Sequence, residues 1–250
     1  VALAGPRTGV STTEIEAVAL ETLASFHLDF RGLEITALEV DGIAASFSRA
    51  DGELIITPET PIGTGERFLT AVDYRGTPET DTEPFGTEWG WIHGDDLVYV
   101  VAEPASAHTW FPGNDHPADK ALFDFTVTVP EPFVAAANGL LVETTAGPGK
   151  TTSRWTMEQP MATYLATVVV GEFVRVDRAG PEGIIVRDYL PPAIADRALR
   201  PFATVGSMIE YFEGVFGPYP FDAYGHVVVP GIGGALENQT LSIFGRGTLG

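Results

Sequence analysis

The sequence GHVVVPGIGGALENQT occupies residues 225–240 and places a strand next to a glycine-rich, polar segment. The apolar run from Gly225 to Val229 is typical of a buried strand, and Pro230-Gly231 ends it. The small residues at positions 233–235 allow another backbone to approach closely. Glu237 then supplies a negative charge at the end of that track. Such an edge could hold an extended peptide by strand addition and bind its free amine.

Upstream of this stretch, alternation of apolar and polar residues predicts β structure as far as about Tyr189. The alternating segments are Phe26–Phe30, Ala37–Val40 and Phe125–Val129. Turn signals such as Asp41-Gly42 and Asn138-Gly139 recur at short intervals. The pattern favours an antiparallel β-sandwich or saddle.

The hydrophobic period changes after Pro191-Pro192, which predicts a domain boundary near residue 190. Apolar residues then recur at the spacing of one helix face, at Phe202, Val205, Ile209, Phe212 and Phe216. The spacing predicts a helix within Pro201–Glu213, with Pro201 in its first turn. An edge strand is expected from Leu236. We therefore expect one domain over residues 1–189 and the start of a second, incomplete domain over residues 190–250.

Several segments resemble the zinc aminopeptidases of the aminopeptidase N and leukotriene hydrolase type. Residues 233–238 resemble the Gly-x-Met-Glu-Asn motif of that family, with Leu236 in place of the methionine. Residues 110–121, WFPGNDHPADKA, are similar to its Phe-Pro-x-x-Asp-x-Pro-x-x-Lys-Ala segment. Further matching segments are Met161–Leu165, Val170–Phe173 and Phe216–Phe221. The matches keep the family order from about Phe26 to Phe244.

The resemblance implies a mainly β fold. An antiparallel β-saddle would be followed by the first helix and strands of a thermolysin-like α+β catalytic domain. It also implies a zinc metallo-aminopeptidase that removes N-terminal residues from peptides, of which this chain is the N-terminal portion. The family holds its zinc with a His-Glu-x-x-His motif, which this chain lacks. Its five histidines include no pair at the i, i+4 spacing of two ligands on one helix face. We therefore expect no metal site, no catalytic residue and no peptidase activity in this chain alone.

The resemblance assigns substrate-binding roles by motif position. Glu237 would bind the free amino group of the substrate, and Glu103, eight residues before Phe111, would be the second amine-binding carboxylate. We expect both carboxylates to reach one cleft, which would fix cleavage at the first peptide bond. The remaining substrate-binding positions are Gly233, Gly234, Ala235, Leu236 and Asn238. Of these, positions 233–235 would contact the peptide through the backbone, and Leu236 is expected to pack.

Three other matched or apolar positions are expected to be structural. Asp115 and Lys120 would form an ion pair that fixes their loop. His226 lies in an apolar run and is expected to be a core histidine.

The amino-acid composition indicates which classes of binding partner to expect. The net charge is −20, from 14 basic and 34 acidic residues, so the surface repels phosphate backbones and anionic lipids. We expect peptides with a free N-terminal amine and the remainder of the catalytic domain as partners, and neither nucleic acid nor membrane. No apolar run approaches the ~20 residues of a membrane helix, and the sequence at Val1 lacks a signal-peptide pattern. The chain has no cysteine, which leaves a cytoplasmic or a secreted location open.

An alternative of a different class is a non-catalytic β-sandwich that binds peptides or a protein partner. The missing zinc motif favours it. A helix without the rest of its domain would expose Phe202, Val205, Ile209 and Phe212, and this argues against it.

Overall fold

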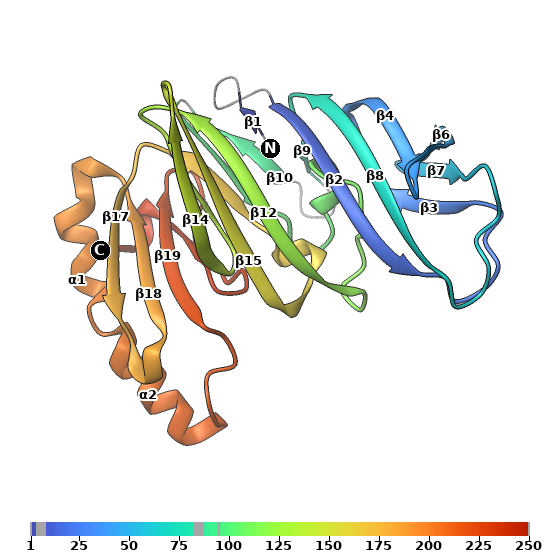
Figure 1. The fold of residues 1–250 in the computed structure, drawn as a ribbon. Helices are drawn as coiled ribbons and strands as arrows, with labels where there is room; N and C mark the ends of the chain where they lie inside the picture. The colour runs from blue at the N-terminus through green and yellow to red at the C-terminus, as the bar shows by residue number, and fades with distance from the viewer. Residues whose placement is uncertain (1, 4–8, 83–87, 95, 250) are drawn as a thin grey trace. The chain divides into compact units, whose positions relative to one another are not determined.

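The structure is a computed structural model that describes residues 2–3, 9–82, 88–94 and 96–249, and strands form most of it (Figure 1). The chain divides into two compact units. The first unit comprises residues 1–92, 101–120 and 162–164. The second comprises residues 93–100, 121–161 and 165–250.

The first unit holds ten strands and a 3-10 helix, η1. They are β1 (Ala2–Leu3), β2 (Gly9–Val18), β3 (Phe26–Asp29), β4 (Glu34–Val40), β5 (Ile43–Ala44), β6 (Ser46–Ala50), β7 (Glu53–Thr57), β8 (Arg67–Gly76), β9 (Thr80–Asp81), β10 (Trp89–His93) and η1 (Ala107–Thr109). Five of the strands form an antiparallel array in the order β1-β2-β8-β4-β5, and β3-β7-β6 form another. In Figure 1 the long strands β2, β8 and β4 run side by side.

Strand β8 illustrates why this sequence forms a sheet with one buried face. Phe68, Thr70, Val72 and Tyr74 are buried, while the residues between them are half-buried or exposed. Side chains in a strand alternate between the two faces, so this pattern places one apolar face toward the core. The core of the unit includes Leu54, Ile56 and Phe30.

The second unit contains the remaining strands, both α-helices and three short 3-10 helices. The strands are β11 (Leu97–Val101), β12 (Lys120–Pro130), β13 (Val134–Ala137), β14 (Leu140–Gly147), β15 (Lys150–Ala162), β16 (Val168–Gly171), β17 (Val174–Ala179), β18 (Ile185–Leu190), β19 (Ala223–Val229), β20 (Ala235–Leu236) and β21 (Ser242–Gly245). The helices are η3 (Pro181–Gly183), η4 (Pro192–Ile194), α1 (Ala195–Phe202), α2 (Val205–Phe216) and η5 (Arg246–Leu249). A further 3-10 helix, η2 (Thr163–Leu165), has its first two residues in the first unit.

Three groups of strands organise the second unit. Two are antiparallel, β14-β15-β12 and β13-β16-β11. The third has the order β17-β18-β19-β21-β20, with β18, β19 and β21 mutually parallel and both outer strands antiparallel to their neighbours. The mainly β fold class is therefore confirmed. An edge strand is present as β20, but it covers Ala235–Leu236 and ends at Leu236, where the prediction had it begin.

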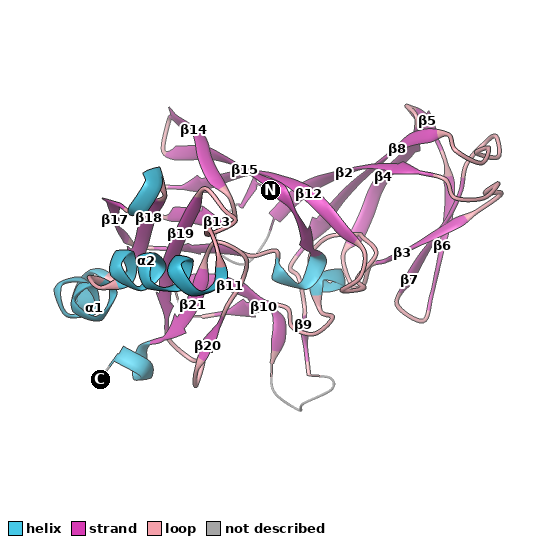
Figure 2. Ribbon diagram, turned by 90° about the horizontal axis from the view of Figure 1, so that it is seen from below, coloured by secondary structure: helices cyan, strands magenta, loops and turns pink. Residues whose placement is uncertain are grey.

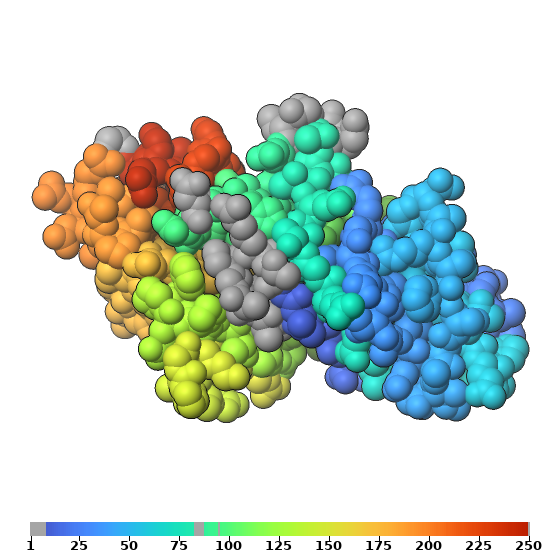
Figure 3. Space-filling model, turned by 90° about the horizontal axis from the view of Figure 1, so that it is seen from above, coloured from blue at the N-terminus to red at the C-terminus, as the bar shows by residue number. Residues whose placement is uncertain are grey.

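The two helices lie against one face of this third sheet (Figure 2). Phe202, Val205 and Ile209 are buried there against Val186 and Val228 of the strands. The C-terminal segment packs on the same cluster through Phe244 and Leu249, and Figure 3 shows it (red) next to the helical residues (orange).

The helix differs from the prediction in two ways. There are two helices, and Pro201 lies near the end of α1 rather than in a first turn. Proline cannot donate its backbone hydrogen bond inside a helix, and α1 ends one residue later. Of the four residues that a helix without its domain would expose, Phe202, Val205 and Ile209 are instead buried against β18 and β19, whereas Phe212 is exposed. The other exposed apolar side chains on α2 are Met208, Tyr211, Val215 and Phe216.

The predicted domain boundary near residue 190 stays a prediction. Strands β17 and β18 precede it in the sequence, and β19 to β21 follow it, yet all five share one sheet. Of the helices in the described part of the chain, none combines the length and apolar character that crossing a bilayer requires.

Candidate functional site

The predicted peptide track lies at the edge of the third sheet of the second unit. β20 pairs with β21 through Ala235 opposite Phe244 and Leu236 opposite Ile243. Just before the strand, the backbone oxygen of Gly234 accepts a hydrogen bond of 2.8 Å from the nitrogen of Gly245. β21 is the only neighbour of β20 among the described strands. β20 is therefore an edge strand of this sheet as far as the described residues go.

The glycines of the track are not required by local packing. A Cβ atom added to Gly233 or Gly234 would meet no atom of the described structure within 4 Å, and neither residue has a positive φ. Gly245 on the neighbouring strand is different, because a Cβ there would lie 1.9 Å from the oxygen of Ile232. The space beside Gly233 and Gly234 is thus open, as a binding role for their backbone requires.

The residues that follow the track differ in exposure. Leu236 is 5% exposed, so its predicted packing role is confirmed. Glu237 is exposed and follows β20 directly. Asn238 is 3% exposed, and its side-chain oxygen and nitrogen have no hydrogen-bond partner within the described residues.

Asn138 holds the segment that follows Glu237 in place. Its amide nitrogen donates to the backbone oxygen of Gln239 at 2.6 Å and to that of Leu165 at 3.0 Å. Its amide oxygen accepts from the backbone nitrogen of Thr167 at 2.7 Å. The whole residue is buried. One side chain therefore ties the candidate site to the end of β13 and to the start of β16.

A second anchor comes from the neighbouring residue. The backbone nitrogen of Gly139 donates to the hydroxyl of Thr240 at 2.8 Å, and its oxygen accepts from the guanidinium of Arg187. Arg187 also donates to the oxygen of Ala137 at 3.1 Å, and burial lowers the pKa of its guanidinium. The sequence indicated only a turn at Asn138-Gly139. No local pattern could have revealed a contact between residues 101 positions apart.

Glu103 belongs to the first unit and is exposed. It follows β11 in a turn that is closed by a hydrogen bond of 2.9 Å from the nitrogen of Ser106 to the oxygen of Ala102. The peptide bond between Glu103 and Pro104 is cis. Because Glu237 belongs to the second unit, the shared cleft of the two carboxylates stays a prediction.

A buried polar cluster lies beside this turn in the first unit. His108 of η1 has its Nδ1 3.0 Å from Asp115 Oδ2 and its Nε2 3.5 Å from Asp81 Oδ2. Asp115 also accepts from the hydroxyl of Thr163 at 3.1 Å. Asp115 thus fixes its loop as expected, but through His108 and Thr163 instead of the predicted partner Lys120, which is exposed.

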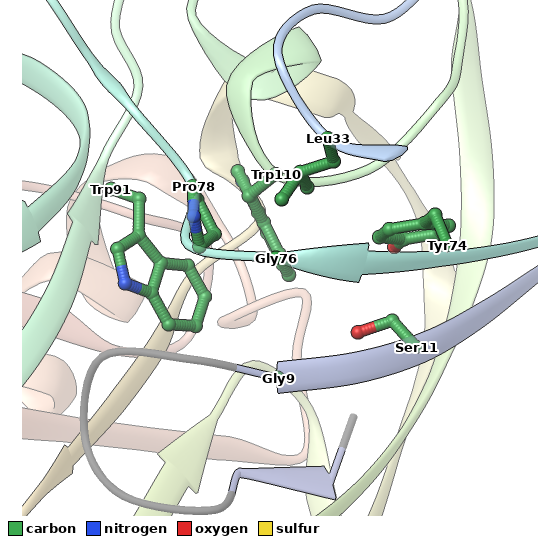
Figure 4. A pocket seen from close by; sticks show the side chains of 8 residues that line it. All are labelled: Gly9, Ser11, Leu33, Tyr74, Gly76, Pro78, Trp91 and Trp110. Atoms are coloured by element: carbon green, nitrogen blue, oxygen red, sulfur yellow. The ribbon is translucent and has the colours of Figure 1, made fainter. Parts of the chain in front are cut away.

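A small cavity in the first unit lies near the same loop (Figure 4). Its volume is about 10 Å³, enough for roughly one water molecule. It is lined by Gly9, Ser11, Leu33, Tyr74, Gly76, Pro78, Trp91 and Trp110. None of the predicted site residues lines it, and it is too small for a peptide side chain.

The histidines are dispersed over the fold. Within the described ranges, no three or more histidine, aspartate or glutamate side chains are grouped as a metal site would require. His226 is a core residue, as predicted. Its ring stacks on Phe202 with 3.9 Å between centroids, and its Nδ1 lies 2.5 Å from the buried carboxylate of Asp188.

Comparison with known proteins places this fold and sequence in one family. Residues 7–165 match the peptidase M1 N-terminal domain. Aminopeptidase M1-B of Oryza sativa subsp. japonica is 30% identical over 230 residues, which cover 85% of this chain and 26% of that protein. Aminopeptidase N of Acetobacter pasteurianus is 30% identical over 201 residues, which cover 79% of this chain and 53% of that protein.

Solved structures agree with the sequence matches. The M1 zinc metallopeptidase from Deinococcus radiodurans has a TM-score of 0.87 and 28% identity, over 97% of this chain and 57% of that chain. A mutant of it bound to a Tyr-Ser-Ala substrate gives a TM-score of 0.88 at 28% identity, over 96% of this chain and 57% of that chain. This chain spans about a quarter of the length of the rice relative and somewhat over half of the bacterial proteins. Because the matched domain covers more than half of its residues, the chain belongs to the peptidase M1 family.

Proposed function

We propose that this chain is the N-terminal part of a zinc metallo-aminopeptidase that removes N-terminal residues from peptides. In that enzyme it recognises the free amine of the substrate and aligns the peptide. The observation that carries the proposal is the position of Glu237, an exposed carboxylate directly after an edge strand with open space beside its glycines.

Alignment of the peptide follows from the edge of the sheet. An extended peptide that adds to β20 would form main-chain hydrogen bonds, which give affinity without demanding a particular side chain. Gly233 and Gly234 support this, because they leave the approach to the strand unobstructed.

Recognition of the amine rests on carboxylate chemistry. An ionised carboxylate accepts charge-assisted hydrogen bonds from an ammonium group, and these are stronger than neutral ones. Glu237 supplies one such group and Glu103 is proposed as the second. Holding the amine at a fixed point sets the register of the peptide, so that its first bond is the one presented for cleavage.

The solved relatives are zinc metallopeptidases, but the described residues of this chain contain no group of ligands that would suit a zinc ion. We therefore assign no step through the metal to residues of this chain. Their proposed contribution is binding and orientation, and the chain alone is expected to be inactive.

The proposal is tested by the affinity of the chain for a tripeptide with a free amine and for its N-acetylated form. Calorimetry near neutral pH should find the free-amine peptide bound about tenfold more tightly, the value of one good charge-assisted contact. Glu237→Gln should remove most of this ratio. Glu210→Gln is the matched control, because Glu210 is an exposed glutamate on α2 in the same unit.

The variant Gly234→Leu tests the alignment of the peptide independently of the recognition of its amine. The Cβ of the new side chain would meet no described atom within 4 Å, so we expect the chain to fold. The rest of the leucine side chain would occupy the track and weaken the binding of both peptides. Equal affinity of the parent chain for both peptides would contradict amine recognition. Equal affinity would instead favour the alternative, a non-catalytic β-sandwich that binds peptides or a protein partner.

A further inference from the structure

We propose that Thr240 is a positioning residue for Glu237. Its hydroxyl accepts a hydrogen bond that holds the turn after Glu237, and this turn sets the direction of the Glu237 carboxylate. The effect on Glu237 rests on the proposed function, whereas the contact made by Thr240 does not. Every contact involved lies in the second unit.

The turn that follows Glu237 has a strained residue at its centre. It comprises residues 238–241 and is closed by a hydrogen bond of 3.2 Å from the nitrogen of Leu241 to the oxygen of Asn238. Of its two central residues, Gln239 and Thr240, only Thr240 has a positive φ, of 67°. A type II turn has a positive φ at this position and favours glycine there, because glycine has no Cβ. A β-branched residue is therefore strained in this place.

Contacts from another segment hold the strained residue. The hydroxyl of Thr240 accepts from the backbone nitrogen of Gly139 at 2.8 Å, and the oxygen of Gln239 accepts from the amide nitrogen of Asn138 at 2.6 Å. Thr240 is 3% exposed, and Asn138 and Gly139 are buried, so water competes poorly for these contacts. The hydroxyl thus explains why a threonine stands where the turn favours glycine.

Gly139 is a rigid point of attachment for Thr240. Its φ is 80°, and a Cβ atom there would lie 1.9 Å from the oxygen of Thr156, so its backbone packs directly against β15. Its oxygen accepts from the guanidinium of Arg187, which also donates to the oxygen of Ala137 at 3.1 Å. Arg187 is itself 1% exposed. The nitrogen that meets the Thr240 hydroxyl is therefore fixed by contacts on both sides of the residue.

Glu237 lies between two buried residues. Leu236, at the end of β20, is 5% exposed, and Asn238, the first residue of the turn, is 3% exposed. Both neighbours hold the backbone of Glu237, which is itself exposed. If the turn opens, the backbone is held on one side only and the carboxylate samples more directions. An amine would then meet it in the required geometry less often.

Hydrogen exchange in the 250-residue chain tests the contact. Thr240→Val removes the acceptor and keeps the branched shape, so the amides of Gly139 and Leu241 should exchange at least about tenfold faster than in the parent chain. Thr240→Ser retains the hydroxyl and should restore most of the protection. Unchanged exchange at both amides in Thr240→Val would overturn the proposal.

Thr152→Val is the matched control for the loss of a threonine hydroxyl. Thr152 of β15 shares a hydrogen bond of 2.8 Å with Thr128 of β12, in the same unit and outside the turn. Exchange at Gly139 and Leu241 should be as in the parent chain. An equal acceleration in Thr152→Val would also overturn the proposal, because the effect would then be one of overall stability.

The ratio of affinities for the free-amine tripeptide and its N-acetylated form tests the positioning role. We expect Thr240→Val to lower this ratio from about tenfold to about threefold or less, and Thr240→Ser to restore most of it. A ratio that stays at the parent value in Thr240→Val, although Gly139 exchanges faster, would refute the positioning role.

Thr240→Gly separates positioning from stability. It removes the hydroxyl and also relieves the strain, so its unfolding equilibrium constant should stay closer to that of the parent chain than that of Thr240→Val does. The affinity ratio should nevertheless fall as far as in Thr240→Val. If the ratio falls in Thr240→Val alone, the loss follows stability and not the hydroxyl, and the positioning role is wrong.

The two proposals fail separately. If the parent chain binds both peptides equally, the proposed recognition of the amine is wrong, while exchange at Gly139 and Leu241 still decides whether Thr240 holds the turn. If the parent chain prefers the free amine, but Thr240→Val keeps both that preference and the parent exchange rates, the role of Thr240 is wrong and the proposed function stands.

Discussion

Replacing Asn138 with alanine removes the side chain that ties the candidate site to the rest of the second unit. Three hydrogen bonds disappear, to the oxygens of Leu165 and Gln239 and from the nitrogen of Thr167. Asn138 and Thr167 are both fully buried, so water cannot easily replace the lost partners.

The expected loss of stability follows from these contacts. Each net hydrogen bond contributes about 1 kcal/mol, and a buried N–H left without an acceptor costs a further 1–3 kcal/mol. We therefore expect Asn138→Ala to lower the free energy of unfolding by about 4–6 kcal/mol. That is a large fraction of the roughly 5–15 kcal/mol typical of folded domains.

Urea unfolding followed by circular dichroism gives the free energy, and hydrogen exchange shows where the structure has opened. The amide of Thr167 should exchange much faster in the variant. Asn114→Ala is the control, because its amide donates only to the exposed carboxylate of Asp119 at 2.7 Å. It should change stability by less than about 0.5 kcal/mol. A loss below about 1 kcal/mol in Asn138→Ala, with unchanged exchange at Thr167, would refute the reasoning.

Three further predictions concern other parts of the chain. Burial raises the pKa of Tyr74 to about 12, so the stabilising contribution of the neutral Tyr74 side chain is present below about pH 10 and is lost as the pH rises toward 12. Over this range, urea titrations should show that the parent chain loses roughly 2–3 kcal/mol more unfolding free energy than Tyr74→Phe. Equal losses in the two chains would contradict the raised pKa of Tyr74. Gly245→Ala should lower the free energy of unfolding by about 2–4 kcal/mol, because the new Cβ would lie 1.9 Å from the oxygen of Ile232. Gly234→Ala should change it by less than about 1 kcal/mol, because its Cβ would meet no described atom within 4 Å. Similar shifts of the melting temperature in the two variants would contradict the open space beside Gly234. The chain incubated with Zn²⁺ and an aminoacyl anilide should release no product above the buffer rate, and turnover abolished by a chelator would reveal a metal site that the dispersed histidines do not suggest.

The strands could be predicted from the sequence because their signal is local. The alternating segments Ala37–Val40 and Phe125–Val129 fall within β4 and β12. The helix limits were less accurate, since Phe202 and Val205 fit one continuous apolar face although the chain breaks between them. Spacing alone does not tell one helix from two that present their faces to the same sheet.

The candidate site was predictable only in part. Motif position singled out Gly233–Asn238, and the structure places that stretch at a sheet edge. The residues that hold it, Asn138 and Gly139, act across 101 positions of sequence. His108 likewise finds its partner Asp81 through the fold and not through spacing. Such contacts depend on tertiary structure, which a single sequence does not display.

The measurement that tests the central claim most directly is a crystal structure of this chain with a free-amine tripeptide. The account predicts an extended peptide alongside β20, with its amino nitrogen within about 3 Å of a carboxylate oxygen of Glu237. A peptide bound elsewhere, or one on β20 with its amine turned away from Glu237, would contradict it.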